Sequence, residues 1–273
     1  MISILIFFAG ASMGSFFSVV IERMQHSEKG IIFGSSKCPH CHKNLCPLDL
    51  VPVLSYIFLR GKCRNCHKSI NKFYPLLELT AGLFLVFNYL HFILKQNIST
   101  ITETSNIIPI GTQLTECIVY GIIGLFVILI SFYDGKYKEV PNLLLYLWIV
   151  ACIIANFFIP SNISNIIFSV ALSMTFYGSQ ILLSKGKWLG SADLFFGIGA
   201  AILLGFERGI VGMILAYISG SIISIFFIAT KILHRKSTIP FIPFLGLGTL
   251  IALFFGNEIV LWYINTSLFN FSV

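Results

Sequence analysis

Residues 117–134 have the sequence CIVYGIIGLFVILISFYD, an uncharged run that ends on an aspartate. A helix needs about 20 mostly apolar residues to cross the hydrocarbon core of a bilayer, and this run is close to that length. Hydrophobic residues make up 56% of the 273 residues, and the mean hydropathy is +0.89. This composition places the chain among integral membrane proteins, with the lipid bilayer as its main surroundings.

Other segments share the apolar character of this run. We predict about eight transmembrane helices, at residues 2–21, 76–94, 117–133, 143–159, 163–183, 194–206, 209–230 and 244–264. The predicted fold class is therefore an all-α polytopic membrane protein. We expect three parts, which are a first transmembrane helix (1–21), a loop large enough to fold (22–75) and a seven-helix membrane domain (76–273).

Basic residues predict the orientation of these spans. When the loops after the first, third, fifth and seventh spans are placed on one side, they hold all of the 18 Lys and Arg residues except Lys95 and Arg208. Loops rich in Lys and Arg stay in the cytosol, so this side is cytosolic and both termini lie outside. The net charge of +7 then reflects topology and contact with anionic lipid headgroups. No nucleic-acid partner is expected, because the longest basic run is Arg235-Lys236.

Two aspartates stand out in a chain with only 11 acidic residues. Asp134 follows the third predicted span and Asp193 precedes the sixth, so the topology puts both at the cytosolic face. Carboxylates beside the hydrocarbon are expensive to keep, which makes them functional candidates. Two close together cannot both ionise comfortably, so they would form an acid/base pair. The alternative is that each is a solvated loop residue.

The predicted cytosolic loop 22–75 carries two C-x-x-C motifs, CPHC at 38–41 and CRNC at 63–66. Paired motifs of this kind direct four thiolates at one point and are typical of structural zinc. We therefore predict a zinc-binding loop domain, in which the metal supplies folding energy to a segment with few large apolar residues. The predicted ligands are Cys38, Cys41, Cys63 and Cys66. Two redox disulfides are the alternative, which the cytosol disfavours.

Several longer motifs follow one another along the chain. They are GSFFSVVIER at 14–23, YPLLELTAG at 74–82, DGKYKEVPN at 134–142 and IPFIPFLGLG at 239–248. In this order they resemble the motifs of the prepilin peptidases, or type IV leader peptidases, which are bacterial membrane aspartyl proteases of the GxGD type. The resemblance implies that Asp134 and Asp193 are the catalytic dyad. It also implies a substrate, the short basic leader of prepilin and pseudopilin precursors, cleaved at the cytosolic face of the bacterial inner membrane.

Some positions differ from the family pattern. Residues 190–193 are Gly-Ser-Ala-Asp, with Ala192 at the second glycine of G-x-G-D, and Ser18 replaces the usual Asn. A glycine permits a positive φ that alanine does not adopt freely, so the substitution bears on the geometry at Asp193.

Many members of the family also N-methylate the new N-terminus with S-adenosylmethionine, and here only the resemblance implies that activity and cofactor. Glu78 is a candidate contributor; its alternative is an interfacial carboxylate paired with a nearby lysine.

Two other classes of protein compete with the peptidase interpretation. An ion-coupled transporter would use the aspartates as proton or cation ligands, and it predicts carboxylates near the bilayer midplane and internal repeats. The sequence places both acids at one face and has no convincing repeat. A non-catalytic scaffold for pilus or secretion assembly is the second alternative, which the change at Ala192 allows.

Overall fold

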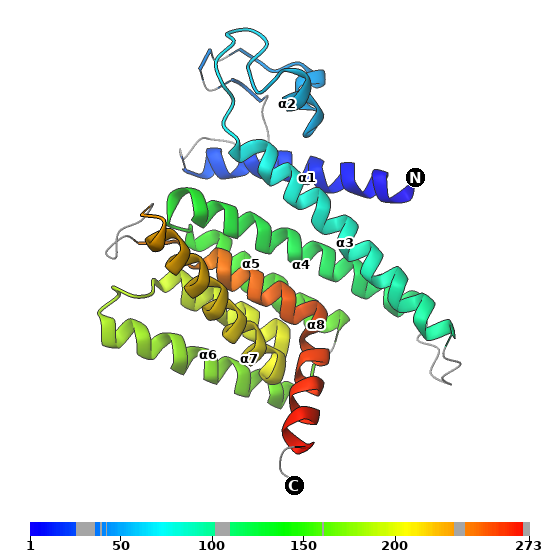
Figure 1. Cartoon of the computed structure of the whole chain (residues 1–273), viewed down its shortest axis with the longest axis vertical. Helices are drawn as coiled ribbons and strands as arrows, with labels where there is room; N and C mark the ends of the chain where they lie inside the picture. Colours follow the sequence, from blue (N-terminus) through cyan, green and yellow to red (C-terminus); the bar gives the residue numbers. More distant parts are fainter. Residues whose placement is uncertain are drawn as a thin grey trace. The chain divides into compact units, whose positions relative to one another are not determined.

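The computed structural model describes residues 1–25, 36–38, 40–41, 43–101, 110–159, 161–231 and 238–269. In these ranges the regular structure is helical, apart from two isolated bridges, and the all-α prediction is confirmed. Figure 1 labels most of the elements, which are α1 (Ile2–Gln25), the short 3₁₀-helix η1 (Pro47–Leu50), α2 (Leu54–Phe58), α3 (Phe73–Ile101), α4 (Ile110–Tyr137), α5 (Asn142–Phe158), α6 (Ile163–Ser184), α7 (Ser191–Ala229) and α8 (Ile242–Phe269).

The predicted count of eight membrane spans is not confirmed. In the described part of the chain, six helices are long and apolar enough to cross a membrane, and α5 is a shorter apolar helix. The six are α1, α3, α4, α6, α7 and α8. The predicted spans at 194–206 and 209–230 are both contained in α7, so the count of eight is not confirmed.

Helix α7 reverses direction at Gly205, close to the boundary between the two spans predicted there. Gly205 has φ 73° and ψ −172°, a non-helical conformation inside the element. Residues on both sides of it, among them Ala201 and Gly212, line one cavity. In a straight helix these two would lie about 16 Å apart along the axis. A Cβ built on Gly212 would also lie 3.3 Å from Cδ1 of Leu204, so the two halves of α7 form a helical hairpin.

The chain divides into two compact units, Met1–Leu129 and Ile130–Val273. In the first unit, α1 packs closely on α3 through small residues. A Cβ on Gly10 would lie 2.6 Å from the carbonyl oxygen of Ala81, and one on Gly14 would lie 2.8 Å from that of Leu77. Small residues let membrane helices approach until their backbones touch, so this pair of helices is held by close packing.

In the second unit, α7 packs against α5, α6 and α8. The rings of Trp148 and Phe196 stack with centroids 5.0 Å apart, and the indole Nε1 of Trp148 donates to the carbonyl of Phe196 at 3.0 Å. Both side chains are fully buried. This contact holds the first half of α7 against α5 about one turn after Asp193. The helix that carries the aspartate is therefore anchored close to it.

Candidate active site and metal centre

Asp134 lies in the last turn of α4 and is 6% exposed. Its Oδ2 accepts a hydrogen bond of 3.2 Å from the backbone N–H of Ile242, the first residue of α8. The first N–H groups of a helix have no partner within the helix, and their partial positive charge favours a carboxylate. The start of α8 therefore supplies a backbone donor to Asp134 from 108 positions away in sequence.

Asp193 is the third residue of α7 and is 9% exposed. Its Oδ2 accepts a hydrogen bond of 2.9 Å from the backbone N–H of Gly190, the residue that precedes the helix. This is the return bond of a capping box, which orients the carboxylate and closes the first turn of the helix.

The same geometry explains why alanine is tolerated at residue 192. Ala192 lies inside the first turn of α7 and is not among the residues with positive φ. Residue 192 does not need the positive φ that glycine adopts readily, so alanine at this position introduces no backbone strain. Alanine is also the better helix former by about 1 kcal/mol. The departure from the G-x-G-D pattern therefore leaves Asp193 well placed.

The two carboxyl groups lie within electrostatic range of each other. In each of them a backbone N–H occupies Oδ2, and in the described part of the chain no hydrogen bond reaches Oδ1. Each acid thus keeps one oxygen for a proton, a water molecule or a substrate. Neighbouring buried carboxylates share a proton, because they cannot both ionise at low cost. The arrangement suits general acid/base hydrolysis by water.

The surroundings of the pair include residues that the sequence did not single out. Tyr177 on α6 and Tyr217 on α7 lie within electrostatic range of Asp193. The hydroxyl of Tyr217 donates to Oε1 of Gln180 at 2.9 Å. No spacing in the sequence marks these side chains, because they meet only when the α7 hairpin packs on α6. The nearest acidic residue in sequence to Asp134, Glu139, is exposed.

The four predicted zinc ligands come together in the first unit. The Sγ atoms of Cys38, Cys41, Cys63 and Cys66 all lie within 4.8 Å of one another, and Sγ of Cys38 is 3.9 Å from Sγ of Cys66. Tetrahedral zinc with Zn–S bonds of about 2.3 Å holds its sulfurs about 3.8 Å apart. The cluster therefore fits a four-coordinate metal ion. The cysteines are free rather than paired in disulfides.

The first cysteine of each C-x-x-C motif donates a backbone hydrogen bond to the residue five positions later. The N–H of Cys38 donates to the carbonyl of Lys43, and the N–H of Cys63 donates to the carbonyl of Lys68, at 3.0 and 2.9 Å. In the second turn the N–H groups of Cys66 and Asn65 lower the pKa of the Cys63 thiol to about 7. A thiol that ionises readily is a better metal ligand, because only the thiolate binds.

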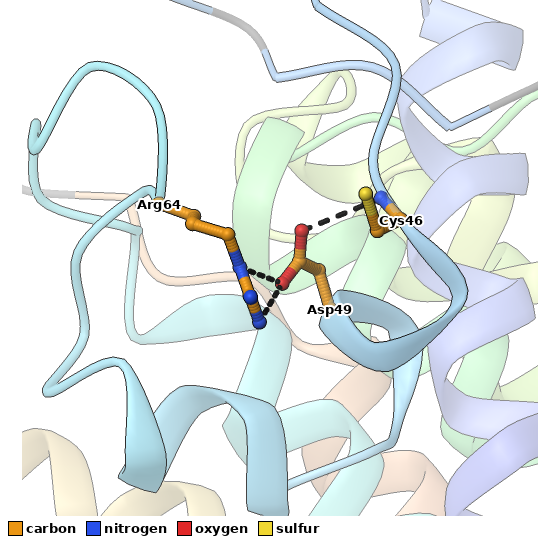
Figure 2. A network of polar contacts seen from close by, with 3 residues as sticks. All are labelled: Cys46, Asp49 and Arg64. Atoms are coloured by element: carbon orange, nitrogen blue, oxygen red, sulfur yellow. Dashed lines mark hydrogen bonds and ion pairs between the residues drawn. The ribbon is translucent and has the colours of Figure 1, made fainter.

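Asp49 connects the second cysteine turn to η1 (Figure 2). Its Oδ1 lies 2.8 Å from both Nε and Nη2 of Arg64, and its Oδ2 accepts the N–H of Cys46 at 3.3 Å. The side chain of Asp49 is only 5% exposed. Because Arg64 lies between Cys63 and Cys66, this contact supports the turn that carries two of the clustered cysteines. Asp49 follows Cys46 by three residues, which is the spacing of a capping box. The sequence could therefore have revealed the bond between Asp49 and the N–H of Cys46.

Glu78 has partners other than the lysine considered from the sequence. It is buried on α3, and its Oε2 accepts a 2.7 Å hydrogen bond from the backbone N–H of Val53. The hydroxyl of Ser15 on α1 also bonds to it. Among the described residues no ion pair joins Glu78 to a lysine. The carboxylate therefore ties the cysteine loop to α1 and α3.

Val53 adopts a rare backbone conformation at this contact. Its φ is 61° and its ψ is −48°, and the N–H of Leu54 donates to the carbonyl of Pro52 at 2.6 Å. Together these describe a classic γ-turn, a strained form that a β-branched residue seldom adopts. Strain of this kind persists only where the surroundings hold it, and the bond to Glu78 is such a restraint.

Two family models match the chain. The Bacterial Peptidase A24 N-terminal domain covers residues 8–92, and the Type IV leader peptidase family covers residues 121–225. The first match contains the cysteine cluster and Glu78, and the second contains both aspartates.

Several known proteins that are similar to this chain carry the name prepilin leader peptidase/N-methyltransferase. One from Bacillus subtilis (strain 168) is 25% identical over 98% of this chain and 100% of its own length. One from Aeromonas salmonicida (strain A449) is 25% identical over 94% of this chain and 84% of its own length. One from Klebsiella pneumoniae is 41% identical over 31% of this chain and 40% of its own length. No solved structure matches the chain.

Proposed function

Because this chain belongs to the type IV leader peptidase family, we propose that it cleaves prepilin-like precursors with Asp134 and Asp193 as an aspartyl dyad. The observation that carries this proposal is the pair of buried carboxylates within electrostatic range of each other, each with one oxygen held by a backbone N–H. The proposed site lies at the cytosolic face of the bacterial inner membrane, where a basic leader meets the apolar helix that follows it.

In the proposed mechanism one aspartate is ionised and the other is protonated. The ionised carboxylate takes a proton from water, and the resulting hydroxide attacks the scissile carbonyl carbon. The protonated carboxyl group donates its proton to the carbonyl oxygen. When the tetrahedral intermediate collapses, the C–N bond breaks and the leaving amine takes up a proton from the dyad. No covalent enzyme intermediate forms, so no serine or cysteine nucleophile is required.

The names of the relatives support a second activity, N-methylation of the new N-terminus. We assign it to the N-terminal half, with S-adenosylmethionine as the methyl donor and Glu78 as a contributor. Zinc is the proposed metal at Cys38, Cys41, Cys63 and Cys66, and its role is structural because four thiolates leave no open coordination position.

Cleavage of a pilin-like substrate by the purified protein tests the dyad. Asp134→Asn and Asp193→Asn should each reduce cleavage by about 10³-fold or more, since asparagine keeps the shape but exchanges no proton. The double variant should be hardly slower than either single one, because the two acids act as a unit. Glu139→Gln is the matched control, since it removes an exposed acid near Asp134 and should cleave normally.

Three results would contradict the proposal in different ways. Cleavage by Asp193→Asn at the wild-type rate would remove that residue from the dyad. Substrate binding without cleavage by the wild-type protein would favour an assembly scaffold. Proton- or cation-coupled transport in vesicles, lost in both aspartate variants, would favour a transporter.

A further inference from the structure

A small cavity lies inside the second unit, where α6, both halves of α7 and α8 meet. Its volume is about 20 Å³, which is room for one water molecule. The side chains of Ser169, Ser173 and Thr249 line it, so its wall is partly polar. Gly197 and Gly212 line it from the two arms of the α7 hairpin, and a Cβ built on Gly197 would lie 2.5 Å from the ring of Tyr177.

One polar group in this wall lacks a partner. Oγ of Ser173 is buried in a residue that is 2% exposed, and it has no hydrogen bond among the described residues. The other two hydroxyls are already donors, Ser169 to the carbonyl of Gly205 at 2.9 Å and Thr249 to that of Leu245 at 2.7 Å. An unsatisfied buried hydroxyl destabilises the fold, because the group has lost its bonds to water.

A water molecule in the cavity would complete these bonds. It needs two to four polar partners, and a hydroxyl oxygen that donates its proton still accepts through its lone pairs. The water can therefore bond to Ser173 and donate to the oxygens of Ser169 and Thr249, which line the same space. An apolar cavity of this size would stay dry, whereas this one has both the room and the partners.

The cavity is also next to the candidate dyad. Gly197 lies four residues after Asp193 on α7, which places it on the same face of the helix, about 6 Å along the axis. Tyr177 lines the cavity and lies within electrostatic range of Asp193. The cavity therefore begins about one helical turn from Asp193, whose side chain is not among its lining residues.

We propose that this cavity is a hydration site, with one ordered water bonded to Ser173, and that it supplies water to the aspartates. Peptide hydrolysis consumes one water per bond, whose oxygen enters the new carboxylate and whose protons pass to the products. A buried store beside the dyad refills the site after each turnover. This role rests on the proposed peptidase function, whereas the hydration site itself does not.

Radiolytic hydroxyl-radical labelling of the purified full-length protein tests occupancy. Radicals form from bound water, so Tyr177, which is only 3% exposed, should be oxidised in the wild-type protein. Ser173→Ala removes the unpartnered hydroxyl and should reduce Tyr177 labelling at least fivefold. Ser173→Thr, which adds a methyl group that displaces the water, should do the same if the alanine variant does not fold. Ser179→Ala on the exposed face of the same helix should label like the wild type.

Cleavage kinetics on the same variants test the supply role. Both Ser173 variants should lower kcat severalfold with KM unchanged, and Ser179→Ala should change neither. Absence of Tyr177 labelling in the wild-type protein would overturn the hydration site. Labelling that is lost in the Ser173 variants while kcat stays constant would overturn the supply role alone. A wild-type protein that is labelled but cleaves nothing would overturn the proposed function and the supply role, and leave the hydration site standing.

Discussion

We predict that the carboxylate of Glu78 holds the strained turn at Val53, and the size of this restraint can be measured. The turn has φ 61° at a β-branched residue, and its N–H is bonded to the buried carboxylate of Glu78 at 2.7 Å. If this bond keeps Val53 in its strained conformation, removal of the carboxylate lets the turn relax. Val53→Gly should then relieve backbone strain in the wild-type protein. In the Glu78→Ala protein the turn has already relaxed, so Val53→Gly should relieve no strain.

The magnitude follows from the backbone conformation. A non-glycine residue in such a region is strained by about 1–3 kcal/mol. Val53→Gly also raises the entropy of the open loop, by about 0.5–1 kcal/mol, and removes a half-buried side chain. These two losses occur in both backgrounds and cancel in a double-mutant cycle. The remaining coupling energy of about 1–3 kcal/mol corresponds to a factor of roughly 5–150 in the opening equilibrium.

Hydrogen exchange of peptides that cover residues 51–58, measured by mass spectrometry, reports this local opening. The change in the opening equilibrium caused by Val53→Gly should be more favourable to the closed loop in the wild-type background than in the Glu78→Ala background. The two changes should differ by the factor of roughly 5–150. Glu78→Gln is the matched control, because its carbonyl oxygen still accepts the N–H of Val53. An equal effect of Val53→Gly in the wild-type and Glu78→Ala backgrounds would refute the restraint, since the turn would then be held by other contacts.

Three further predictions follow from the geometry. Purified protein should contain one zinc per chain by elemental analysis, and Cys41→Ser should lose it, whereas Cys46→Ser should keep it because that thiol is exposed and outside the cluster. Ala192→Gly should keep cleavage but loosen the first turn of α7 by about 1 kcal/mol, seen as faster amide exchange there; a large gain in cleavage would mean that alanine distorts the site. Gly205→Ala should destabilise the protein by at least about 1–3 kcal/mol, because φ 73° with ψ −172° is a conformation almost confined to glycine. Gly178→Ala, with nothing within 4 Å of the added Cβ, should be neutral or stabilising in the same thermal melt.

Several features of this protein follow from local patterns in the sequence, and these features were predictable. Apolar runs and the distribution of Lys and Arg predict a helical membrane protein, because each spanning helix must by itself be long and apolar enough for the bilayer. The two C-x-x-C motifs predicted the cysteine cluster, because each brings two thiols together within four residues. Asp134 and Asp193 were candidates because carboxylates are rare in this chain and both follow or precede apolar spans.

Contacts between residues distant in sequence were decided only by the tertiary structure. The N–H of Ile242 reaches Asp134 across 108 positions, and Val53 reaches Glu78 across 25. The lysine partner considered for Glu78 gave way to backbone and hydroxyl donors, since packing of α1 on α3 buries this carboxylate. The spans predicted at 194–206 and 209–230 are the two arms of one hairpin, and the tertiary structure places the reversal at Gly205. Hydropathy measures how apolar a segment is, whereas the direction of a chain and the partners of a buried polar atom depend on which surfaces meet.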